Sequence, residues 1–324
     1  MDRSREFRLI STGGQNTELV STADLSPDGG ALLVAGIWSG LNWVDLSSGR
    51  VLKLSSDKLR AARFLRDGQT FFANVDHEKM LLWPLRVSTN HAGELNASLG
   101  LARTLPGADW NISDSASLSD DERLVGGKID RGEVRIVRRD ETNRVTRLRG
   151  ALNACRPTFS ADHRWVVTAS EGGGGPCHWD ADTGKLVRVL HAHPGNGGAQ
   201  FSPDGRVLVT SDTTGVRFYE TATWTVTRHL PADLGTGLAG CAAFTPDSRL
   251  VAFTTGKRVL RLADPRTGEV LATLTSPEPR PINSLRFSRD GRLLAVATST
   301  DAVDLWDIGL LDEGLKKLGL GLPR

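Results

Sequence analysis

The chain has 324 residues, a formal net charge of +2 and 24% charged residues, an ordinary composition for a soluble protein. Its 35 glycines and 14 prolines are typical of a chain with many turns. No stretch approaches the ~18 consecutive apolar residues of a membrane span, so the composition excludes a membrane-spanning helix.

The N-terminus and the cysteines bear on location. The first six residues lack the apolar core of a signal peptide. Cys155, Cys177 and Cys241 are too few and too dispersed for a disulfide framework, and their odd number fits a reducing compartment. We therefore expect a cytoplasmic protein.

One five-residue phrase recurs along the chain. Its most regular copy is Phe201-Ser202-Pro203-Asp204-Gly205. Seven copies, close or loose, open at Leu25, Phe64, Leu118, Phe159, Phe201, Phe244 and Phe287. The steps between them are 39, 54, 41, 42, 43 and 43 residues, so one step is long and the others are nearly equal. Repeats of about 40–45 residues fit units of four short strands.

The sequence around each copy has the chemistry of strands. Residues 206–210 are apolar and β-branched, and the Asp-Gly pair before them favours a tight turn between two strands. A third strand follows, as in 216–219, then a second turn, as in 182–185, and a fourth strand, as in 269–274. Four antiparallel strands in each of seven units predict an all-β, seven-bladed β-propeller.

We expect one propeller domain over residues 1–324. In chain order its predicted parts are a closing strand of blade 7 (5–11), blade 1 (18–56), blade 2 with an insertion (58–106), blade 3 (107–150), blade 4 (151–191), blade 5 (196–232), blade 6 (238–276), blade 7 (281–309) and a C-terminal tail (310–324). The last unit ends after three strands at Trp306-Asp307-Ile308, and residues 6–11 read like a fourth strand. The N-terminal strand is therefore predicted to complete blade 7 and close the ring, which removes an open edge.

Two segments depart from the repeat. The long step places extra sequence between Leu85 and Ala108, of which 90–96 is polar and loop-like. A surface insertion between the third and fourth strands of blade 2 is expected, with a binding role as the alternative. The tail has leucines at helical spacing, which favours a short helix or turn packed under the ring. A linker to another domain is the alternative.

The repeated phrases, with Trp179-Asp180 and Trp306-Asp307 closing third strands, resemble those of WD-repeat β-propellers from about Arg5 to Ile308. The resemblance is to a divergent, bacterial-type member, because few of the third strands keep the family's Trp. The corresponding positions hold Val44, Trp83, Val137, Trp179, Tyr219, Ala263 and Trp306. The resemblance implies a rigid, usually non-catalytic interaction platform. It also implies a buried His–Ser/Thr–Asp–Trp hydrogen-bond chain, which blade 5 approaches with His191 or His193, Thr210 or Ser211, Asp212 and Tyr219.

Strand order predicts which loops share a face. The Ser-Pro-Asp-Gly turns join first to second strands at the bottom, so the loops from second to third strands and from blade to blade lie on top. We expect the partner-binding surface there, with the candidate residues Trp38, His77, Trp110, Arg131, Glu171, His191, His193, Asp212, Arg280 and Asp301. Trp38 and Trp110 stand out, because aromatic anchors are enriched at binding hot spots. Each could instead fold onto its own blade.

Three patterns could carry other chemistry. His191 and His193 could approach a metal with Cys155, but no fourth ligand is set by the sequence, so no metal and no cofactor are predicted. Residues 172–175 are four glycines without the Lys-Ser/Thr end of a phosphate loop. Blade 3 is rich in arginine, at positions 131, 135, 138, 139, 144, 147 and 149. Interspersed acidic residues favour a solvated edge over a nucleic-acid surface.

The sequence therefore predicts a non-catalytic scaffold that binds a protein or peptide partner through its top-face loops. We expect no membrane partner, and a chain that is monomeric or part of a larger complex. The alternative is a propeller enzyme or small-ligand binder that uses the mouth of the central channel, where His77, Glu78, Glu171, His191 and Asp212 could converge. A deep pocket of titratable groups with perturbed pKa values would favour the alternative.

Overall fold

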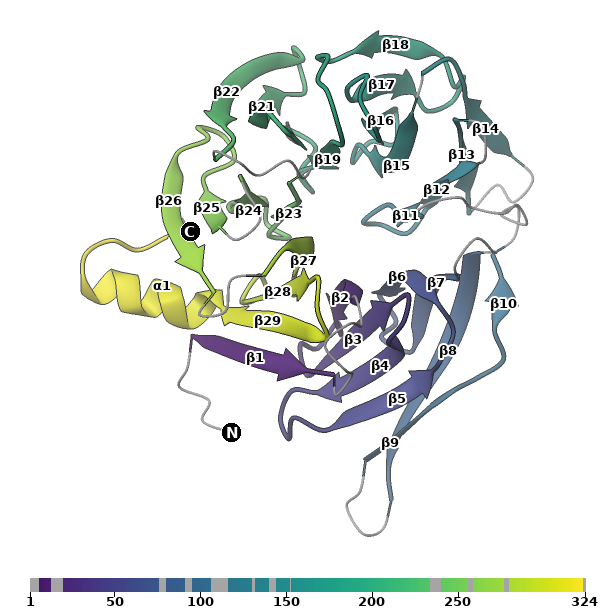
Figure 1. The fold of residues 1–324 in the computed structure, drawn as a ribbon, viewed down its shortest axis with the longest axis vertical. Coiled ribbons are helices and arrows are strands. Elements are labelled where there is room, and N and C mark those ends of the chain that lie inside the picture. Colours follow the sequence, from purple (N-terminus) through teal and green to yellow (C-terminus); the bar gives the residue numbers. More distant parts are fainter. Residues whose placement is uncertain are drawn as a thin grey trace. The chain divides into compact units, whose positions relative to one another are not determined.

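The described part of the chain consists mainly of β-strands and the turns between them, with one helix. The computed structural model describes residues 6–12, 20–75, 80–90, 95–105, 116–129, 132–139, 144–151, 153–233, 240–255, 259–276 and 280–322. The strands in these residues form seven antiparallel sheets, six of four strands and one of five. These sheets are the blades of a seven-bladed β-propeller, which confirms the predicted fold class (Figure 1).

Residue contacts divide the chain into two compact units. Unit 1 comprises Met1–Leu105 and Asn283–Leu322, and unit 2 comprises Pro106–Ile282 with Pro323 and Arg324. Unit 1 contains blade 7 (strand order β1-β29-β28-β27), blade 1 (β2-β3-β4-β5) and blade 2 (β10-β8-β7-β6, with β9 on β8). Their bounds are β1 Phe7–Ser11, β2 Val20–Leu25, β3 Ala31–Gly36, β4 Gly40–Asp45, β5 Val51–Ser55, β6 Leu59–Phe64, β7 Thr70–Val75, β8 Met80–Thr89, β9 Leu95–Leu99, β10 Arg103–Thr104, β27 Ile282–Phe287, β28 Leu293–Thr298 and β29 Ala302–Asp307.

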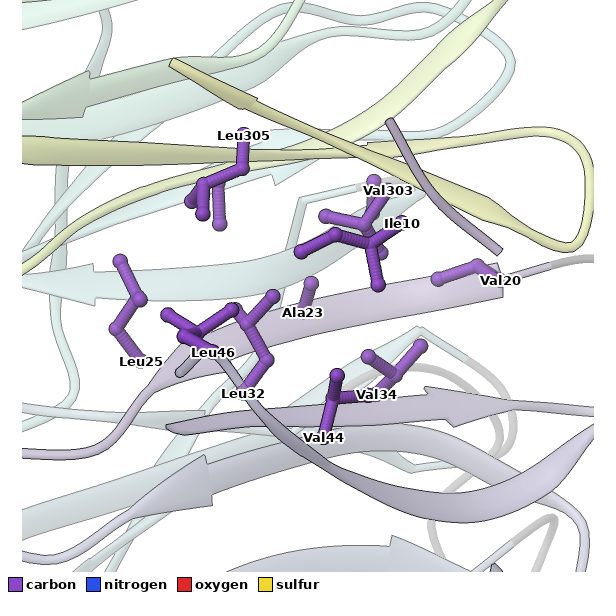
Figure 2. Packing of buried hydrophobic residues seen from close by; sticks show 12 residues of the cluster. Ile10, Val20, Ala23, Leu25, Leu32, Val34, Val44, Leu46, Val303 and Leu305 are labelled. Atoms are coloured by element: carbon purple, nitrogen blue, oxygen red, sulfur yellow. The ribbon is translucent and has the colours of Figure 1, made fainter. Parts of the chain in front are cut away.

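The N-terminal strand completes blade 7, as predicted. β1 pairs antiparallel with β29, from Phe7 opposite Trp306 to Ser11 opposite Ala302. The Phe7 and Trp306 rings meet edge to face, with centroids 4.8 Å apart. In the core, Ile10 lies beside Val303 in a buried cluster that also takes residues from β2, β3 and β4 (Figure 2). The first and last strands of the described chain thus share one core.

Deletion of residues 1–12 is expected to lower the melting temperature by on the order of 5 °C or more. The deletion removes the outer strand of blade 7 together with the Ile10 and Phe7 contacts, and it leaves the apolar face of β29 open to water. Calorimetry of the two chains measures the shift. An unchanged melting curve would show that β1 does not contribute to the stability of blade 7.

The insertion in blade 2 differs from the predicted loop. Residues 90–96 were expected to be loop-like, but β9 begins at Leu95 and pairs with the far end of β8, Leu85 opposite Leu99. The reason is that apolar residues alternate with polar ones from Leu95 to Leu99, although the composition of the segment is polar. Leu95, Ala97 and Leu99 pack on the apolar cluster that includes Leu52 and Trp43 of blade 1. The insertion is therefore in part a β-hairpin arm, seen as the β8–β9 extension in Figure 1.

The tail forms the helix α1, Ile308–Lys317. It begins at the N-cap Asp307, whose carboxylate accepts a hydrogen bond from the Leu310 N–H at 2.8 Å. It ends before Gly319, which has a left-handed φ of 76°. The helix contacts β28, which agrees with the helical spacing of its leucines. Within the described residues, no helix has the length and apolar character needed to cross a membrane.

Unit 2 contains blades 3 to 6, each with its strands in sequence order. Their bounds are β11 Ser117–Leu118, β12 Leu124–Ile129, β13 Glu133–Arg138, β14 Val145–Leu148, β15 Ala154–Phe159, β16 Trp165–Ser170, β17 Cys177–Asp180, β18 Leu186–Val189, β19 Gly198–Phe201, β20 Val207–Asp212, β21 Gly215–Glu220, β22 Thr225–Pro231, β23 Ala242–Phe244, β24 Val251–Thr254, β25 Val259–Ala263 and β26 Val270–Thr275.

The repeated phrase is a turn held by its own side chains. Ser202 Oγ donates to Asp204 Oδ1 at 2.6 Å and accepts from the Val207 N–H at 2.9 Å. The same Ser/Thr–Asp bond recurs in the turns of other blades, at Ser26–Asp28, Ser119–Asp121, Ser160–Asp162, Thr245–Asp247 and Ser288–Asp290. In unit 2 the Asp204 N–H also donates to Ser248 Oγ, at 2.9 Å in the next blade's turn. The phrase therefore has a structural role in building the blades.

Candidate functional site

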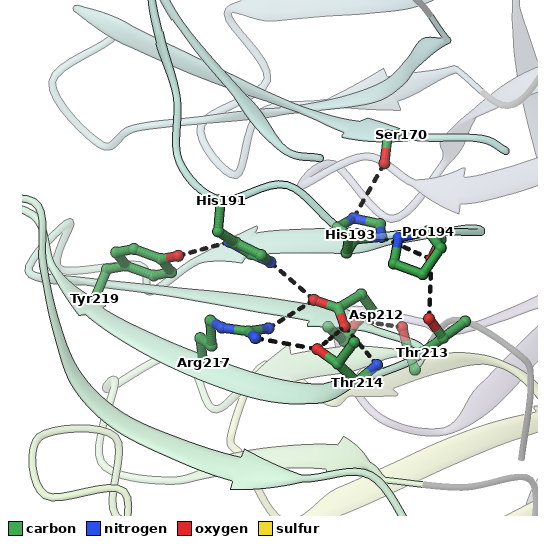
Figure 3. A network of polar contacts seen from close by, with 11 residues as sticks. Ser170, His191, His193, Pro194, Asp212, Thr213, Thr214, Arg217 and Tyr219 are labelled. Atoms are coloured by element: carbon green, nitrogen blue, oxygen red, sulfur yellow. Dashed lines mark hydrogen bonds and ion pairs between the residues drawn. The ribbon is translucent and has the colours of Figure 1, made fainter. Parts of the chain in front are cut away.

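The structure brings three of the ten predicted site residues together. His191, His193 and Asp212 meet in unit 2, where they form a polar cluster with Tyr219, Arg217 and Thr214 (Figure 3). His77, Trp110 and Arg131 lie outside the described residues. The other four predicted residues, Trp38, Glu171, Arg280 and Asp301, have surroundings of their own.

The centre of the polar cluster is the side chain of His191. This residue lies in the segment between β18 and β19, at the end of the blades opposite to the Ser-Pro-Asp-Gly turns. Its Nδ1 is 2.7 Å from the Tyr219 hydroxyl and its Nε2 is 2.8 Å from Asp212 Oδ2. Tyr219 occupies the Trp position of blade 5, so His191 forms part of the hydrogen-bond chain that the resemblance implied, through its bonds to Tyr219 and Asp212. Ser211, also a candidate for this chain, donates instead to the Gly240 carbonyl at 2.5 Å.

Asp212 is the charged anchor of the cluster. It ends β20, and its carboxylate accepts from Arg217 Nη1 at 2.7 Å and from the Thr214 N–H at 2.6 Å. Burial raises the pKa of Asp212, but hydrogen bonds from His191 and Thr214 and the charge of Arg217 outweigh burial. The net effect holds this pKa far below its ordinary value. Asp212 is therefore a carboxylate at every physiological pH.

His193 belongs to the same cluster but has a different task. Its Nε2 is 3.2 Å from Ser170 Oγ at the end of β16, and its Nδ1 is 3.1 Å from the Pro194 carbonyl. The side chain is buried. His193 thus links the segment 190–198 to blade 4, while His191 links it to blade 5. The segment that joins these two blades is fastened at both ends by hydrogen bonds.

The cluster resembles a metal site in geometry but not in charge. One ligand atom from each of His191, His193 and Asp212 lies within 4.8 Å of the others. Cys155, which was weighed in the sequence as a possible third ligand of a metal that was not predicted, is not a member of this group, and Asp212 takes the third position. However, the Arg217 guanidinium already neutralises the Asp212 carboxylate at 2.7 Å, and a divalent cation would meet this fixed positive charge. The residues fit a buried ion pair better than a metal centre.

Substitution of Asp212 by Asn is expected to lower the free energy of unfolding by about 2 kcal/mol. The amide keeps the size of the side chain but leaves Arg217, whose side chain is largely buried, without its counter-charge. Urea denaturation at pH 7 measures the loss. Asp301→Asn is the matched control, since its carboxylate accepts an exposed hydrogen bond from Ser11. Equal losses in the two variants would contradict the anchoring role of Asp212.

Trp38 is the predicted residue with the clearest exposure. It lies in the loop between β3 and β4 of unit 1, and the residue is 60% exposed. The Lys58 ammonium lies 4.7 Å from the centre of the indole, a cation–π contact from the neighbouring loop between β5 and β6. Trp38 therefore does not fold into the core of its own blade. It stands on the surface at the end of blade 1 that was predicted to bind.

The other three described candidates form local contacts. Glu171 follows β16 and forms a 2.7 Å ion pair with Lys128 at the end of β12. Asp301 accepts from Ser11 Oγ at 3.2 Å, and its backbone carbonyl accepts from the Thr12 N–H at 2.9 Å. Arg280 precedes β27 and is half-buried. Each lies in a loop of the predicted kind.

The arginines of blade 3 share acidic partners within the fold. Glu133 lies within ion-pairing distance of Arg135, Arg147 and Arg149. Asp182 of blade 4 pairs with Arg138 at 2.6 Å and with Arg144 at 3.4 Å. Two carboxylates thus reduce, without cancelling, the positive charge of these five arginines.

Sequence reasoning missed Arg217 and Thr214, which complete the polar cluster. The signal for Thr214 was present, because an Asp followed two residues later by a Thr is a common local bonding pattern. Arg217 was harder to find. It enters the cluster only because the Asp212–Gly215 pair ends the β20–β21 hairpin and brings the two side chains to one face. The pairing register decides that contact.

Comparison with known proteins supports the repeat reading. Residues 268–307 match the family model of the WD domain, G-beta repeat (WD40). The matched segment covers β26 to β29 and ends at Trp306-Asp307. WD repeat-containing protein SL1-17 of Schistosoma mansoni is 29% identical over 132 residues, which are 40% of this chain and 42% of that protein. The match thus spans about two fifths of the relative. With the fold, these two matches support a WD-repeat β-propeller family for the chain.

Proposed function

We propose that the protein is a non-catalytic scaffold that binds a protein or peptide partner through the loops opposite its Ser-Pro-Asp-Gly turns. The observation that carries the proposal is the exposure of Trp38, which leaves 60% of the residue's surface accessible. A tryptophan held on a surface loop with a cation on its ring has the composition of an interface hot spot. Propellers of the WD-repeat kind are generally interaction platforms, which agrees with this reading.

The pKa shifts of the described residues also favour binding over catalysis. Asp212 is held ionised. Burial raises the pKa of the Cys177 thiol to about 11, and burial lowers the pKa of His178 to about 4. Each shift holds its group in one protonation state at neutral pH, whereas a general acid or base needs a pKa near the working pH. These groups therefore act as structural residues.

Substitution of Trp38 by Ala is expected to abolish capture of at least one partner from native cell extract without lowering the melting temperature. The indole is exposed, so its loss removes contact area for a partner but little core packing. Leu101→Ala is the matched control, because Leu101 is an exposed apolar residue of unit 1 between β9 and β10. Direct binding of the purified partner to the three chains measures the affinity loss, about tenfold or more.

Equal retention of every captured protein by the wild type and the Trp38→Ala variant would remove this loop from the binding surface. Equal loss in the Leu101→Ala variant would show that capture depends on apolar surface in general. Turnover of a small substrate that is lost in Asp212→Asn, at a temperature where that variant stays folded, would favour the enzymatic alternative.

A further inference from the structure

A tryptophan of blade 5 stands where blades 1, 4 and 6 have glycine. The turn between third and fourth strands follows one pattern, Asp45 to Gly49, Asp180 to Gly184 and Asp264 to Gly268, with the fifth N–H donating to the first carbonyl. Blade 5 makes the same turn from Glu220 to Trp224, with the same bond at 2.7 Å. Trp224 has a φ of 56°, close to the φ of 71° at Gly184. A bulky side chain in the left-handed region is disfavoured, and such outliers concentrate at functional sites.

The glycines at this position allow close packing that Trp224 prevents. A Cβ on Gly184 would lie 2.3 Å from the Arg147 carbonyl, and one on Gly268 would lie 2.6 Å from Arg228 Cγ. In both cases the fourth strand of the preceding blade packs directly on the turn. Between blades 4 and 5 the indole of Trp224 lies in the seam instead. We call the surface formed there by Arg164, Trp165, Arg188 and Trp224 the seam surface.

The floor of the seam surface is a buried histidine. The His178 ring stacks on Trp224 with centroids 3.6 Å apart, and Trp165 meets it edge-on at 4.6 Å. His178 is 2% exposed, and within the described structure neither ring nitrogen has a hydrogen-bond partner. Buried polar atoms without partners are costly and rare in native folds. The two unpaired nitrogens of His178 and the left-handed backbone of Trp224 are independent observations. Both indicate that this seam has a role besides packing.

The rim carries two guanidinium groups that form no close ion pair among the described residues, and the charge of Arg164 also acts on the Asp180 carboxylate. Arg164 lies over Trp165, 4.5 Å from the ring centre, and Arg188 lies over Trp224 at 5.9 Å and donates to its carbonyl at 3.2 Å. Among the residues that the structure describes, no carboxylate lies within ion-pairing distance of either group. This contrasts with the arginines of blade 3, which share Glu133 and Asp182. A guanidinium held flat on an aromatic ring presents its edge to an anion.

The strand beside the rim favours an extended ligand. β18 is the last strand of its sheet, so one edge of its backbone is unpaired within that sheet. Arg188 pairs with His178 on one face of the strand, and Val189, 44% exposed, pairs with Cys177 on the other, while the register shift beside them leaves Val187 at a β-bulge. An added strand would set an acidic side chain beside Arg188 and an apolar side chain beside Val189.

We propose that the seam surface is a second binding site, which takes an extended segment of a protein partner in which anionic residues alternate with apolar ones. The anion pairs with Arg164 and Arg188, and the backbone of the segment pairs with β18. The anionic group is a carboxylate or a phosphorylated side chain. This site is built from residues of unit 2, whereas Trp38 belongs to unit 1, and it does not depend on the function proposed for the Trp38 loop.

The test titrates the full chain with four probes: a heptapeptide alternating Glu with Val, the same peptide with phosphoserine for Glu, its Gln counterpart, and inorganic phosphate alone. We expect saturable quenching of tryptophan fluorescence by an anionic peptide, with a Kd of roughly millimolar or tighter, and none by the Gln peptide. Arg164→Gln with Arg188→Gln should weaken binding about tenfold or more. Arg228→Gln, at the position on blade 5 that matches Arg188, is the control and should leave binding unchanged.

The outcomes distinguish a phosphorylated partner from an acidic one. They also show whether the seam surface binds a peptide at all. Tighter binding of the phosphoserine peptide than of the Glu peptide assigns a phosphorylated partner, and the reverse assigns an acidic one. Binding of inorganic phosphate alone, with no peptide preferred, would overturn the proposed segment. Equal weakening by Arg228→Gln, or no saturable signal with either anionic peptide at about 10 mM, would overturn the site. Trp38→Ala should leave these titrations unchanged.

Discussion

Replacement of Trp179 by Ala is expected to lower the free energy of unfolding by about 3–5 kcal/mol, the range for truncating a large aromatic residue in a core. Trp179 is fully buried on β17, in the cluster where blades 3 and 4 pack together. Its Nε1 donates to Thr168 Oγ1 at 2.9 Å, inside a hydrophobic surrounding. The variant would therefore leave a large cavity and also remove the N–H group that donates a hydrogen bond to Thr168 Oγ1. Urea denaturation followed by circular dichroism measures the change.

Two further variants separate these effects. Trp179→Phe keeps most of the ring volume and removes the donor, so a loss of about 1–2 kcal/mol is expected. Trp306→Ala changes the corresponding tryptophan of blade 7, which is only half-buried, so a smaller loss than for Trp179→Ala is expected. If Trp306→Ala cost as much as Trp179→Ala, burial would not explain the importance of this position.

Acidification is expected to destabilise the protein through His178. Burial is the largest cause that lowers its pKa to about 4, the charge of Arg188 acts in the same direction, and Asp180 opposes both. The unfolded chain has an ordinary histidine pKa near 6.5. Between these two values the unfolded state binds the extra proton, so stability falls as the pH is lowered from about 6.5 to about 4. The loss attributable to His178 reaches at most about 3 kcal/mol at the lower end.

The His178→Phe variant tests this expectation, because it keeps an aromatic ring between Trp165 and Trp224 but cannot be protonated. Its free energy of unfolding should fall less than that of the wild type between pH 6.5 and pH 4, and the difference isolates His178 from the carboxylates that also titrate. His229→Phe, at an exposed position on β22, is the control and should follow the wild type. Parallel pH profiles for wild type and His178→Phe would contradict the lowered pKa.

The two candidate surfaces differ in how visible they are in the sequence. Trp38 was found from its place in a loop between second and third strands, and the structure shows it exposed. The seam surface was missed, although its signal was in the repeat: Trp224 falls where Gly184 and Gly268 fall in their turns. The sequence could not show which side chain contacts Trp224 across the seam. His178 lies 46 positions earlier, and only the packing of blade 5 on blade 4 stacks the two rings.

By itself the sequence determined the repeat, the strand order, the Ser-Pro-Asp-Gly turns and the pairing of the N-terminal strand with β29. These features follow from local chemistry: turn residues, strand alternation and the Ser–Asp bond act over a few positions. Only the tertiary structure decided which charged side chains form ion pairs. Asp212 pairs with Arg217, and Glu133 pairs with three arginines. It also made a strand of part of the insertion. Such contacts depend on register and on packing between blades, which single residues in one sequence do not encode.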